Sequence, residues 1–517
     1  GSVVQGDLTL RSGHANSITD EGDSGVVTVD GNLTATTYAN NGSITLNDLA
    51  VDGTIGLNTH GTGNATVLND AGFQFAASSV GGNLHATATT GNMTQSGALD
   101  IEGTTTLITS ADDATITLGT TSNAFTGALL ITTNDSGTDT AGDVSVHGGT
   151  TALVIGNSTV DGDLTLTSTA TGAAAITDTG TLNIRGATTI SASSVDVTLN
   201  SAANNFQGSI AINGSDVIVV NAYAATDLAA STVTGTYTLT AGGSITDSGA
   251  LAITGVTTID ASSGNVTLDT TTNNFQGAVK IDGVNVTVVD AGAIDLGAST
   301  VTGTYAVTAT TGGDITDSGI LAITGAATFT AANGQSIYLD GANTFSNTVT
   351  FGSGGTLANV TISDSNDFAL AALTLSGNLI ATSTGGSITD SGALAITGVT
   401  TLVTSANGAT IVLDTTTNAF TGAVTITTND NDSPTDGTYA AHVTIDGGTT
   451  ALVIAASTID GDLTLTSGAT AGITDSGTVT VLGDIYLITD AGNGVIDMGT
   501  LAVTGSVDLT THGSGDA

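Results

Sequence analysis

Apolar and polar residues alternate along this chain in short runs, each centred on a glycine. The pattern reads apolar, any, Gly, any, apolar or Thr, any, apolar or Ala, and residues 160–166, 253–259 and 275–281 are three of its copies. Alternation with a period of two indicates β-strands that bury one face. Each copy therefore predicts a strand beside a tight turn.

The central glycine recurs through the whole chain, mostly at intervals of about 20 to 30 residues, which is typical of solenoid coils. Asn347 replaces it once. The glycines are Gly6, Gly31, Gly53, Gly82, Gly103, Gly127, Gly162, Gly186, Gly208, Gly235, Gly255, Gly277, Gly303, Gly325, Gly377, Gly398, Gly422, Gly461, Gly483 and Gly505. No single coil could bury its apolar face alone, so coils must stack. We expect an all-β fold: one continuous single-stranded parallel β-helix (a β-solenoid) over residues 1–517, with about 21 coils. Right-handed winding is the default for parallel crossovers.

The coils are of three types, which together make a unit of about 70 residues. The first type reads Ser-Thr-Val-Thr-Gly at 299–303, the second reads Leu-Ala-Ile-Thr-Gly at 321–325, and the third carries a phenylalanine. The five phenylalanines are Phe125, Phe206, Phe275, Phe345 and Phe420. A ligand-binding stripe is one interpretation. We favour a structural one, in which each ring fills the same core or corner pocket in every third coil.

The two ends of the sequence resemble each other. GDLTLRSGHANSITD at 6–20 matches GDLTLTSGATAGITD at 461–475, and LAVDGTIGLNTHG at 49–61 matches LAVTGSVDLTTHG at 501–513. The offsets are 455 and 452 residues, so we hypothesise a super-repeat of about 450 residues. The chain would then be slightly more than one period of a longer protein.

Composition excludes several classes of partner. The chain has 46 acidic and only three basic residues, a net charge of -43, and no Cys or Trp. Nucleic acid needs a basic patch to neutralise phosphate, and an anionic membrane surface would repel this chain. No apolar run approaches the length of a membrane span. Val, Ile, Leu and Ala are spread evenly in short runs, which argues against disorder.

No residue pattern points to catalysis. Enzymes that act on acidic sugars generally need positive charge, but Arg11, Arg185 and Lys280 lie far apart in the sequence. Inverting hydrolases need two or three acids at one unique site, whereas these acids follow the repeat. We therefore expect no enzymatic activity and no cofactor other than a possible calcium ion.

Two intervals, Gly127 to Gly162 and Gly422 to Gly461, are longer than the corresponding ones and predict loop insertions at 134–143 and 429–437. The insertions carry six closely spaced aspartates: Asp135, Asp139, Asp143, Asp430, Asp432 and Asp436. Carboxylate oxygens suit Ca²⁺, so each loop is a candidate metal site. The alternative is a solvated polar loop, because neither matches a complete calcium motif. The aspartates of the recurring Ile-Thr-Asp turns are instead assigned to turn geometry.

The repeats of residues 273–325, NNFQGAVKIDGVNVTVVDAGAIDLGASTVTGTYAVTATTGGDITDSGILAITG, resemble those of filamentous haemagglutinin-like adhesins, which leave the cell by two-partner secretion. They are also similar to repeats of autotransporter passengers and giant surface proteins. The resemblance covers essentially the whole chain. It implies a right-handed β-helix displayed on a bacterial cell surface, with adhesive or matrix roles and no catalytic residues.

Two functions remain open. The first is a structural segment of an extracellular bacterial fibre, with further copies of the same repeat as its partners. The second is an adhesin that binds glycans or proteins of a host or neighbouring cell through its side face or the two loops. Glycan binding that disappears when residues 134–143 and 429–437 are deleted would favour the second.

Overall fold

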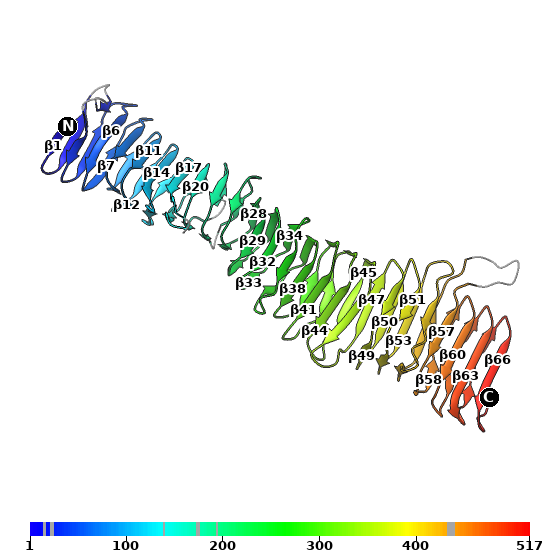
Figure 1. The fold of residues 1–517 in the computed structure, drawn as a ribbon. Helices are drawn as coiled ribbons and strands as arrows, with labels where there is room; N and C mark the ends of the chain where they lie inside the picture. Colours follow the sequence, from blue (N-terminus) through cyan, green and yellow to red (C-terminus); the bar gives the residue numbers. More distant parts are fainter. Residues whose placement is uncertain (14–16, 21–24, 138–139, 172–175, 193–194, 432–439) are drawn as a thin grey trace. The chain divides into compact units, whose positions relative to one another are not determined.

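The structure is a computed structural model that describes all residues except 14–16, 21–24, 138–139, 172–175, 193–194 and 432–439 (Figure 1). The described residues form strands and turns and no helix, so they hold no helix that could cross a membrane. The chain is an all-β parallel β-solenoid of about 22 turns, which confirms the predicted fold class. Two compact units divide it, residues 1–263 and 264–517.

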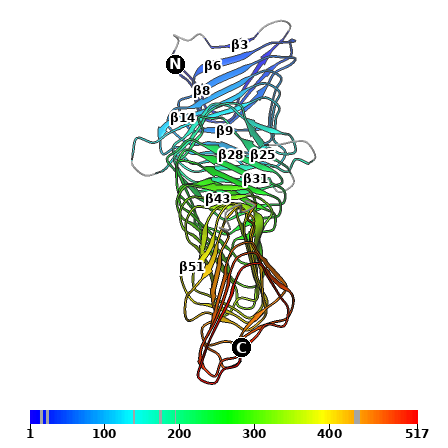
Figure 2. The same cartoon turned by 90° about the vertical axis from the view of Figure 1, so that its right-hand side faces the viewer.

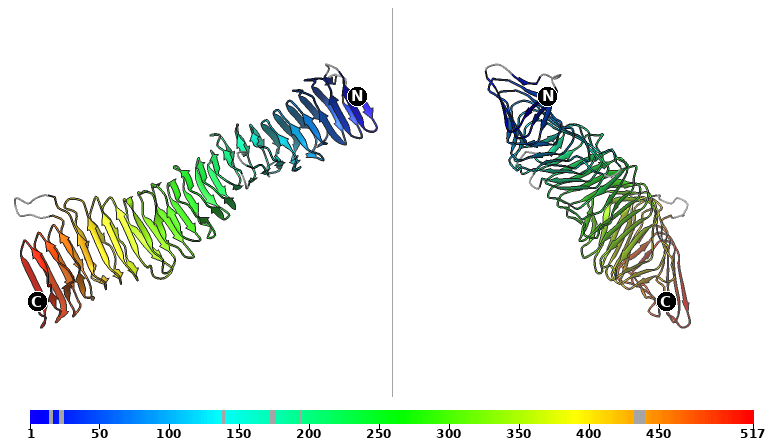
Figure 3. Two further views of the ribbon diagram at one scale, coloured as in Figure 1. Left: turned by 180° about the vertical axis from the view of Figure 1, so that it is seen from behind. Right: turned by 60° about the vertical axis from the view of Figure 1, so that its left-hand side comes forward.

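Each unit is a stack of turns. The first runs from β1 (Ser2–Val4) to β34 (Thr257–Ala261), drawn from blue to green in Figure 2. The second runs from β35 (Val266–Leu268) to β66 (Val507–His512), drawn from green to red in Figure 3. In both units, strands that are one turn apart in the sequence lie side by side.

Most turns contain three strands. In the second unit, two successive turns consist of β39 (Ile294–Leu296), β40 (Ser299–Val301) and β41 (Tyr305–Ala309), then β42 (Ile315–Asp317), β43 (Leu321–Ile323) and β44 (Ala327–Ala331). Each strand pairs in parallel with its counterpart one turn later. Along one sheet, Val266 pairs with Val286, Val286 with Tyr305, and Tyr305 with Ala327. Each step from one partner to the next is therefore one turn of the solenoid.

Side chains alternate between the core and the surface, as the sequence pattern predicts. In β41, Tyr305, Val307 and Ala309 are buried, whereas Ala306 and Thr308 between them are partly exposed. The core is made of Val, Ile and Leu from every turn, stacked on the same residue types one turn away. Full burial of one such side chain stabilises the fold by about 1.5–3 kcal/mol, so this stacking is the main favourable term.

Short stacks, each made of three strands from three successive turns, interrupt the longer runs of paired strands. One short stack consists of β40, β43 and the last two residues of β45 (Ile337–Phe345). Below it, that is one turn earlier in the sequence, lies a single longer strand, β37 (Val279–Gly283). This strand pairs with β39 through Val279 and with β40 through Asp282 and Gly283. The three predicted coil types are the three strands of a short stack.

Six short stacks lie within the described parts of the two units. The other five are formed by β1 (Ser2–Val4), β4 (Val27–Val29) and the last three residues of β6 (Ile44–Val51); β10 (Ser78–Val80), β13 (Leu99–Ile101) and β16 (Ala124–Phe125); β20 (Ser158–Val160), β23 (Leu182–Ile184) and β26 (Asn205–Phe206); β49 (Leu373–Leu375), β52 (Leu394–Ile396) and β55 (Ala419–Phe420); and β59 (Ser457–Ile459), β62 (Val479–Val481) and β65 (Leu501–Val503). The ladder glycines therefore stack in groups of three and not in one continuous column.

The predicted repeating unit does not return to the same sheet. In the first unit, the equivalent strands β12 (Met93–Gln95) and β32 (Ser244–Asp247) belong to one sheet, and β22 (Ile176–Asp178) belongs to the other. In the second unit, β42 and β61 (Ile473–Asp475) share a sheet that β51 (Ile388–Asp390) does not join. The turn below a short stack holds only two strands, so one repeat makes about three and a half turns, not the three coils expected.

A serine closes the lower end of most short stacks. The N–H of Ile281 lies between the two pairings of β37 and donates to Ser299 Oγ at 3.0 Å, and this hydroxyl donates to Gly297 O at 3.0 Å. The same two bonds occur at Ser78, Ser158, Ser231 and Ser457. Leu373 takes this position in β49, whose stack forms a separate three-stranded sheet.

Ser299→Ala is expected to lower the free energy of unfolding by about 1–3 kcal/mol, because the buried N–H of Ile281 loses its acceptor. Urea denaturation measures the effect. Thr300→Ala, on the neighbouring exposed side chain, is the control and should cost clearly less. Equal losses from both variants would show that the serine hydroxyl has no special role.

Candidate functional site

Glycine and an adjacent Asp or Asn form a ladder at the corner that follows the strands of each short stack. Gly325 N–H donates to Gly303 O at 3.0 Å, and Gly398 N–H donates to Gly377 O at 2.9 Å. A Cβ atom on Gly325 would overlap the carbonyl group of Gly303, which explains why only glycine fits. The side chain of the residue after the glycine adds a second row of hydrogen bonds to the ladder. Asn378 Oδ1, for example, accepts the N–H of Val399 at 2.8 Å.

In this second row of the ladder, carboxylates and amides accept the hydrogen bonds interchangeably. Its members each accept a main-chain N–H from the following turn: Asp7, Asn32, Asn64, Asn83, Asp143, Asp163, Asp216, Asn265, Asn285, Asn359, Asn378, Asp462 and Asp484. Asp143, a predicted calcium ligand, is one of them and accepts the N–H of Asp163 at 2.8 Å. Its Oδ1 is therefore used within the fold.

The Ile-Thr-Asp aspartates hold the next turn. Asp178 accepts the N–H groups of Asn200 and Ser201, and its Oδ2 lies 2.6 Å from Asn204 Nδ2. Asn204 Oδ1 in turn accepts the N–H of Leu182 at 2.9 Å. Asp317 with Asn343 and Asp390 with Asn418 repeat the Asp–Asn contact at 2.7 Å. These carboxylates serve turn geometry, but they bind the backbone of the following turn and not their own.

The five phenylalanines lie in the core, and none is more than 1% exposed: Phe125, Phe206, Phe275, Phe345 and Phe420. Each is the last residue of a two-residue strand or of β45. The Phe345 ring centroid lies 6.0 Å from that of Phe329, at an edge-to-face angle of 79°. Such a pair adds about 0.5–1.5 kcal/mol beyond the area that it buries.

Above some of these phenylalanines, a polar side chain replaces the missing next strand. The N–H of Phe206 donates to Asn221 Oδ1 at 3.0 Å, that of Phe275 to Asp290 Oδ2 at 2.7 Å, and that of Phe345 to Asp364 Oδ1 at 3.1 Å. We call these three residues the upper caps. Burial raises the pKa of Asp364 to about 6, although the N–H groups of Phe345 and Asn366 act in the opposite direction. Burial also raises the pKa of Asp290.

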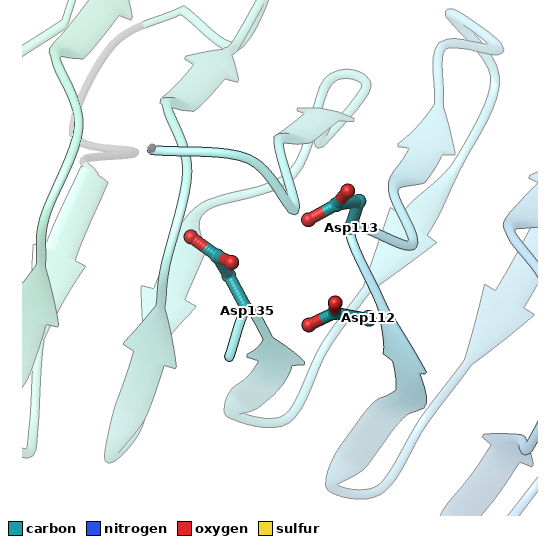
Figure 4. Close-up of side chains that lie close together, drawn as sticks. All are labelled: Asp112, Asp113 and Asp135. Carbon is teal, nitrogen blue, oxygen red and sulfur yellow. The ribbon is translucent and has the colours of Figure 1, made fainter. Parts of the chain in front are cut away.

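The first inserted loop contributes to an acidic cluster (Figure 4). Asp112 ends β14 (Thr105–Asp112), Asp113 follows it, and Asp135 follows β17 (Leu129–Asn134) one turn later. One carboxylate oxygen from each residue lies within 4.8 Å of the others, and among the described residues no other group of three acids is so close. Three oxygen ligands of this kind could contribute to a Ca²⁺ site.

Hydrogen bonds and an ion pair already occupy much of this cluster. Asp135 Oδ1 accepts the N–H of Gly137 at 2.6 Å, and its Oδ2 lies 3.5 Å from Arg185 Nη1. Arg185 also lies 3.7 Å from Asp161, and it holds the start of the loop against the following turns. Asp112 accepts the N–H of Ser136 at 2.6 Å, and this bond lowers the pKa of Asp112.

The predicted ligands fall in different places. Asp135 joins Asp112 and Asp113, whereas Asp143 belongs to the ladder and Asp139 lies outside the described residues. The sequence pattern did not point to Asp112 and Asp113. Their position about one turn before Asp135 was the signal that could have found them, because residues one turn apart lie side by side.

The second loop lacks the same cluster among its described residues. Asn407 takes the place of Asp112 and accepts the N–H of Asn431 at 2.6 Å, and Gly408 takes the place of Asp113. Asp430 Oδ2 accepts the N–H of Ala440 at 2.9 Å. The other two predicted ligands of this loop, Asp432 and Asp436, lie outside the described residues. An Asn that replaces Asp in the same hydrogen bond indicates a structural role at this position.

Repeats of unknown function (DUF5649) match the sequence at residues 62–132, 141–213, 214–282, 283–352, 357–427 and 440–497. Together these copies cover about four fifths of the chain. The chain belongs to this family of repeats. No curated protein and no solved structure matches it.

The DUF5649 copies have the length of the predicted unit. The copy at residues 283–352, for example, contains the short stack of β40, β43 and β45. The structural unit of DUF5649 is therefore about three and a half turns with one short stack. Its description states no function, so the likeness to filamentous haemagglutinin-like adhesins stays a prediction.

Gly325→Ala is expected to lower the free energy of unfolding by about 1–3 kcal/mol, because the methyl group would push the turns at 303 and 325 apart. Gly354→Ala is the matched control, since a Cβ atom there meets nothing within 4 Å and should change stability by less than about 0.5 kcal/mol. Thermal or urea unfolding compares the two variants. An unaltered Gly325→Ala protein would contradict the close approach of these turns.

The calcium prediction is tested by titration calorimetry of the full chain. A calcium site at the acidic cluster would bind in the range of about 10⁻⁴–10⁻³ M, and Asp113→Asn would abolish this binding. Asp143→Asn is the control and should leave the calcium heat unchanged, because the Oδ1 of Asp143 is used by the ladder. The absence of any heat at millimolar Ca²⁺ would leave the acidic cluster as a purely structural feature.

Proposed function

We propose that this chain is a structural segment of an extracellular bacterial surface fibre, without catalytic activity. The observation that supports it is the use made of the polar side chains. Carboxylates and amides recur at equivalent corners in successive repeats, and they accept main-chain N–H groups of the next turn. A protein built to present a unique site would keep some of these groups for a ligand.

The energetics of a repeat array fit this role. Each turn is stabilised by its two neighbours, so stability grows with the number of turns and added repeats extend the structure without new chemistry. Further copies of the same repeat are therefore the partners that we propose. The net charge of -43 would keep neighbouring fibres apart at low ionic strength, and added salt would screen this repulsion.

The sequence resemblance supplies the proposed location. Filamentous haemagglutinin-like proteins are secreted and displayed on bacterial surfaces, and we propose the same location for this chain. The absence of Cys is compatible with export, since no disulfide has to form outside the cell. An adhesive role would be added to the fibre through its side face or its two loops.

A gene deletion combined with electron cryotomography tests the proposal. Cells that express the parent protein should carry surface filaments, and gold-labelled antibodies against this segment should decorate them along their length. A strain that lacks the gene should lose these filaments, and the restored gene should return them.

Labelling confined to the cell interior would overturn the proposal. Filaments that persist in the deletion strain, together with lost attachment to a glycan-coated surface, would instead favour an adhesin that is not itself the fibre. If chromatographic assays showed that the purified chain cleaves polysaccharides, the proposal that it has no catalytic activity would be wrong.

A further inference from the structure

The upper caps accept the N–H group of a core phenylalanine with two different chemical groups, an amide in Asn221 and a carboxyl group in Asp290 and Asp364. Asn221, Asp290 and Asp364 are each buried, with at most 1% of the residue exposed. In the cap at Asn221 both ends of the amide are used: Oδ1 accepts the N–H of Phe206, and Nδ2 donates to Phe206 O at 2.9 Å and to Thr226 Oγ1 at 3.1 Å. Oδ1 also accepts the N–H of Tyr223 at 3.1 Å, so this side chain accepts two hydrogen bonds and donates two.

Asp364 occupies the equivalent position without a donor. Its Oδ1 accepts the N–H groups of Phe345 and Asn366, both at 3.1 Å. Its Oδ2 is buried and has no hydrogen-bond partner among the described residues. An ionised carboxylate would leave this oxygen charged and unsolvated in the corner, which is unfavourable. A proton on Oδ2 would turn it into a donor with the geometry of the Asn221 amide.

The other buried acid, Asp290, is arranged differently. Its Oδ2 accepts the N–H of Phe275 at 2.7 Å, and its Oδ1 accepts the N–H of Gly292 at 2.6 Å. Each oxygen thus has a donor, and both bonds favour the ionised form. The unpartnered oxygen distinguishes Asp364 from Asp290.

The surroundings of Asp364 favour the neutral form. The strand below, β45, carries Asp340, and the loop that follows Asp364 carries Asp367, whose charge opposes ionisation of Asp364. Asn343 of β45 lies opposite Asp364 in the strand pairing, and its side chain binds a further acid, Asp317. In the turn above, residues 379–387 include no ionisable side chain. No basic residue lies on these segments, so an ionised Asp364 would have no counter-ion there.

We propose that Asp364 is a proton-binding site: its O–H group donates from Oδ2 to the backbone and stabilises the upper cap over Phe345 in acid, and this stabilisation is lost at neutral pH. The ligand is a proton, and the element that it stabilises is the corner formed by Phe345, Asp364 and Asn366. This inference does not depend on the proposed function, because it concerns the local stability of one repeat.

The direction of the pH effect follows from linkage. In the closed corner the pKa of Asp364 is about 6, and in an opened corner it returns to about 3.8. A carboxyl with a raised pKa in the closed state stabilises that state most below pH 3.8, and this stabilisation is lost as the pH rises through 6. Between pH 5 and pH 8 the opening equilibrium constant should rise about tenfold.

Hydrogen–deuterium exchange of the full chain tests the proposal, with rates corrected for the intrinsic pH dependence of exchange. Peptides that cover residues 337–370 should lose about tenfold in protection between pH 5 and pH 8. Asp364→Asn should remove this difference and keep the pH 8 protection at the level of the wild-type chain at pH 5.

The first unit supplies the matched control. Peptides around Phe206 should show no such pH dependence in the wild-type chain, because Asn221 does not titrate. Asn221→Asp should create a pH dependence of the same sign there. A wild-type dependence that survives in Asp364→Asn would overturn the proposal, because another group would then be responsible.

Infrared spectroscopy gives a second readout that needs no stable variant. At pH 5 the folded wild-type chain should show the C=O stretch of a protonated, buried carboxyl, and this band should disappear by pH 8. If Asp364→Asn folds, its spectrum at pH 5 should lack the same band. A wild-type spectrum without any protonated carboxyl at pH 5 would also overturn the proposal.

Discussion

Most main-chain N–H groups of the described residues find their acceptor one turn away, at a spacing of about 4.8 Å, and this constraint sets the role of many polar residues. Within strands the neighbouring strand supplies the acceptor. At bends it cannot, and a short side chain supplies it: Asn378 and its equivalents along the ladder, Asp178 and its equivalents in the Ile-Thr-Asp turns. The short stacks extend the same logic, with Ser299 below and Asp364 above. These two caps do for a stack what capping residues do for a helix.

This constraint also accounts for the unusual composition. An acceptor at a bend must be short, and both Asp and Asn meet that need, so the two exchange freely between repeats. Asp462 and Asn378 make the same bond at the same ladder position. Each Asp at such a bend adds one negative charge to a chain whose net charge is -43. The exposed carboxylates cost little because water solvates them, whereas the buried Asp364 has a strongly perturbed pKa.

The sequence predicted the parallel β-solenoid, the alternation of buried and exposed residues and the length of the repeating unit, because all three depend on local periodicity. It did not predict that consecutive repeats alternate between two sheets. That property arises because β37 is a single strand below two, and a five-residue strand reads the same from sequence in either setting. The acidic cluster was found only in part, since Asp112 and Asp113 approach Asp135 through the registration of neighbouring turns. The pairing of Arg185 with Asp135 joins residues from different turns and had no signal in the sequence.

The two-strand turn has a consequence for anything that contacts the surface of a unit. Equivalent residues of adjacent repeats lie on different sheets, so a partner that approaches from one side meets the same chemical feature only in every second repeat. Two repeats comprise about seven turns, which corresponds to a rise of about 34 Å. A bivalent molecule of that reach could bridge two identical features on one side, whereas the matching features on the opposite side would be offset by half that distance. The surface thus carries two series of equivalent features, one on each sheet, and each series has twice the period of the sequence repeat.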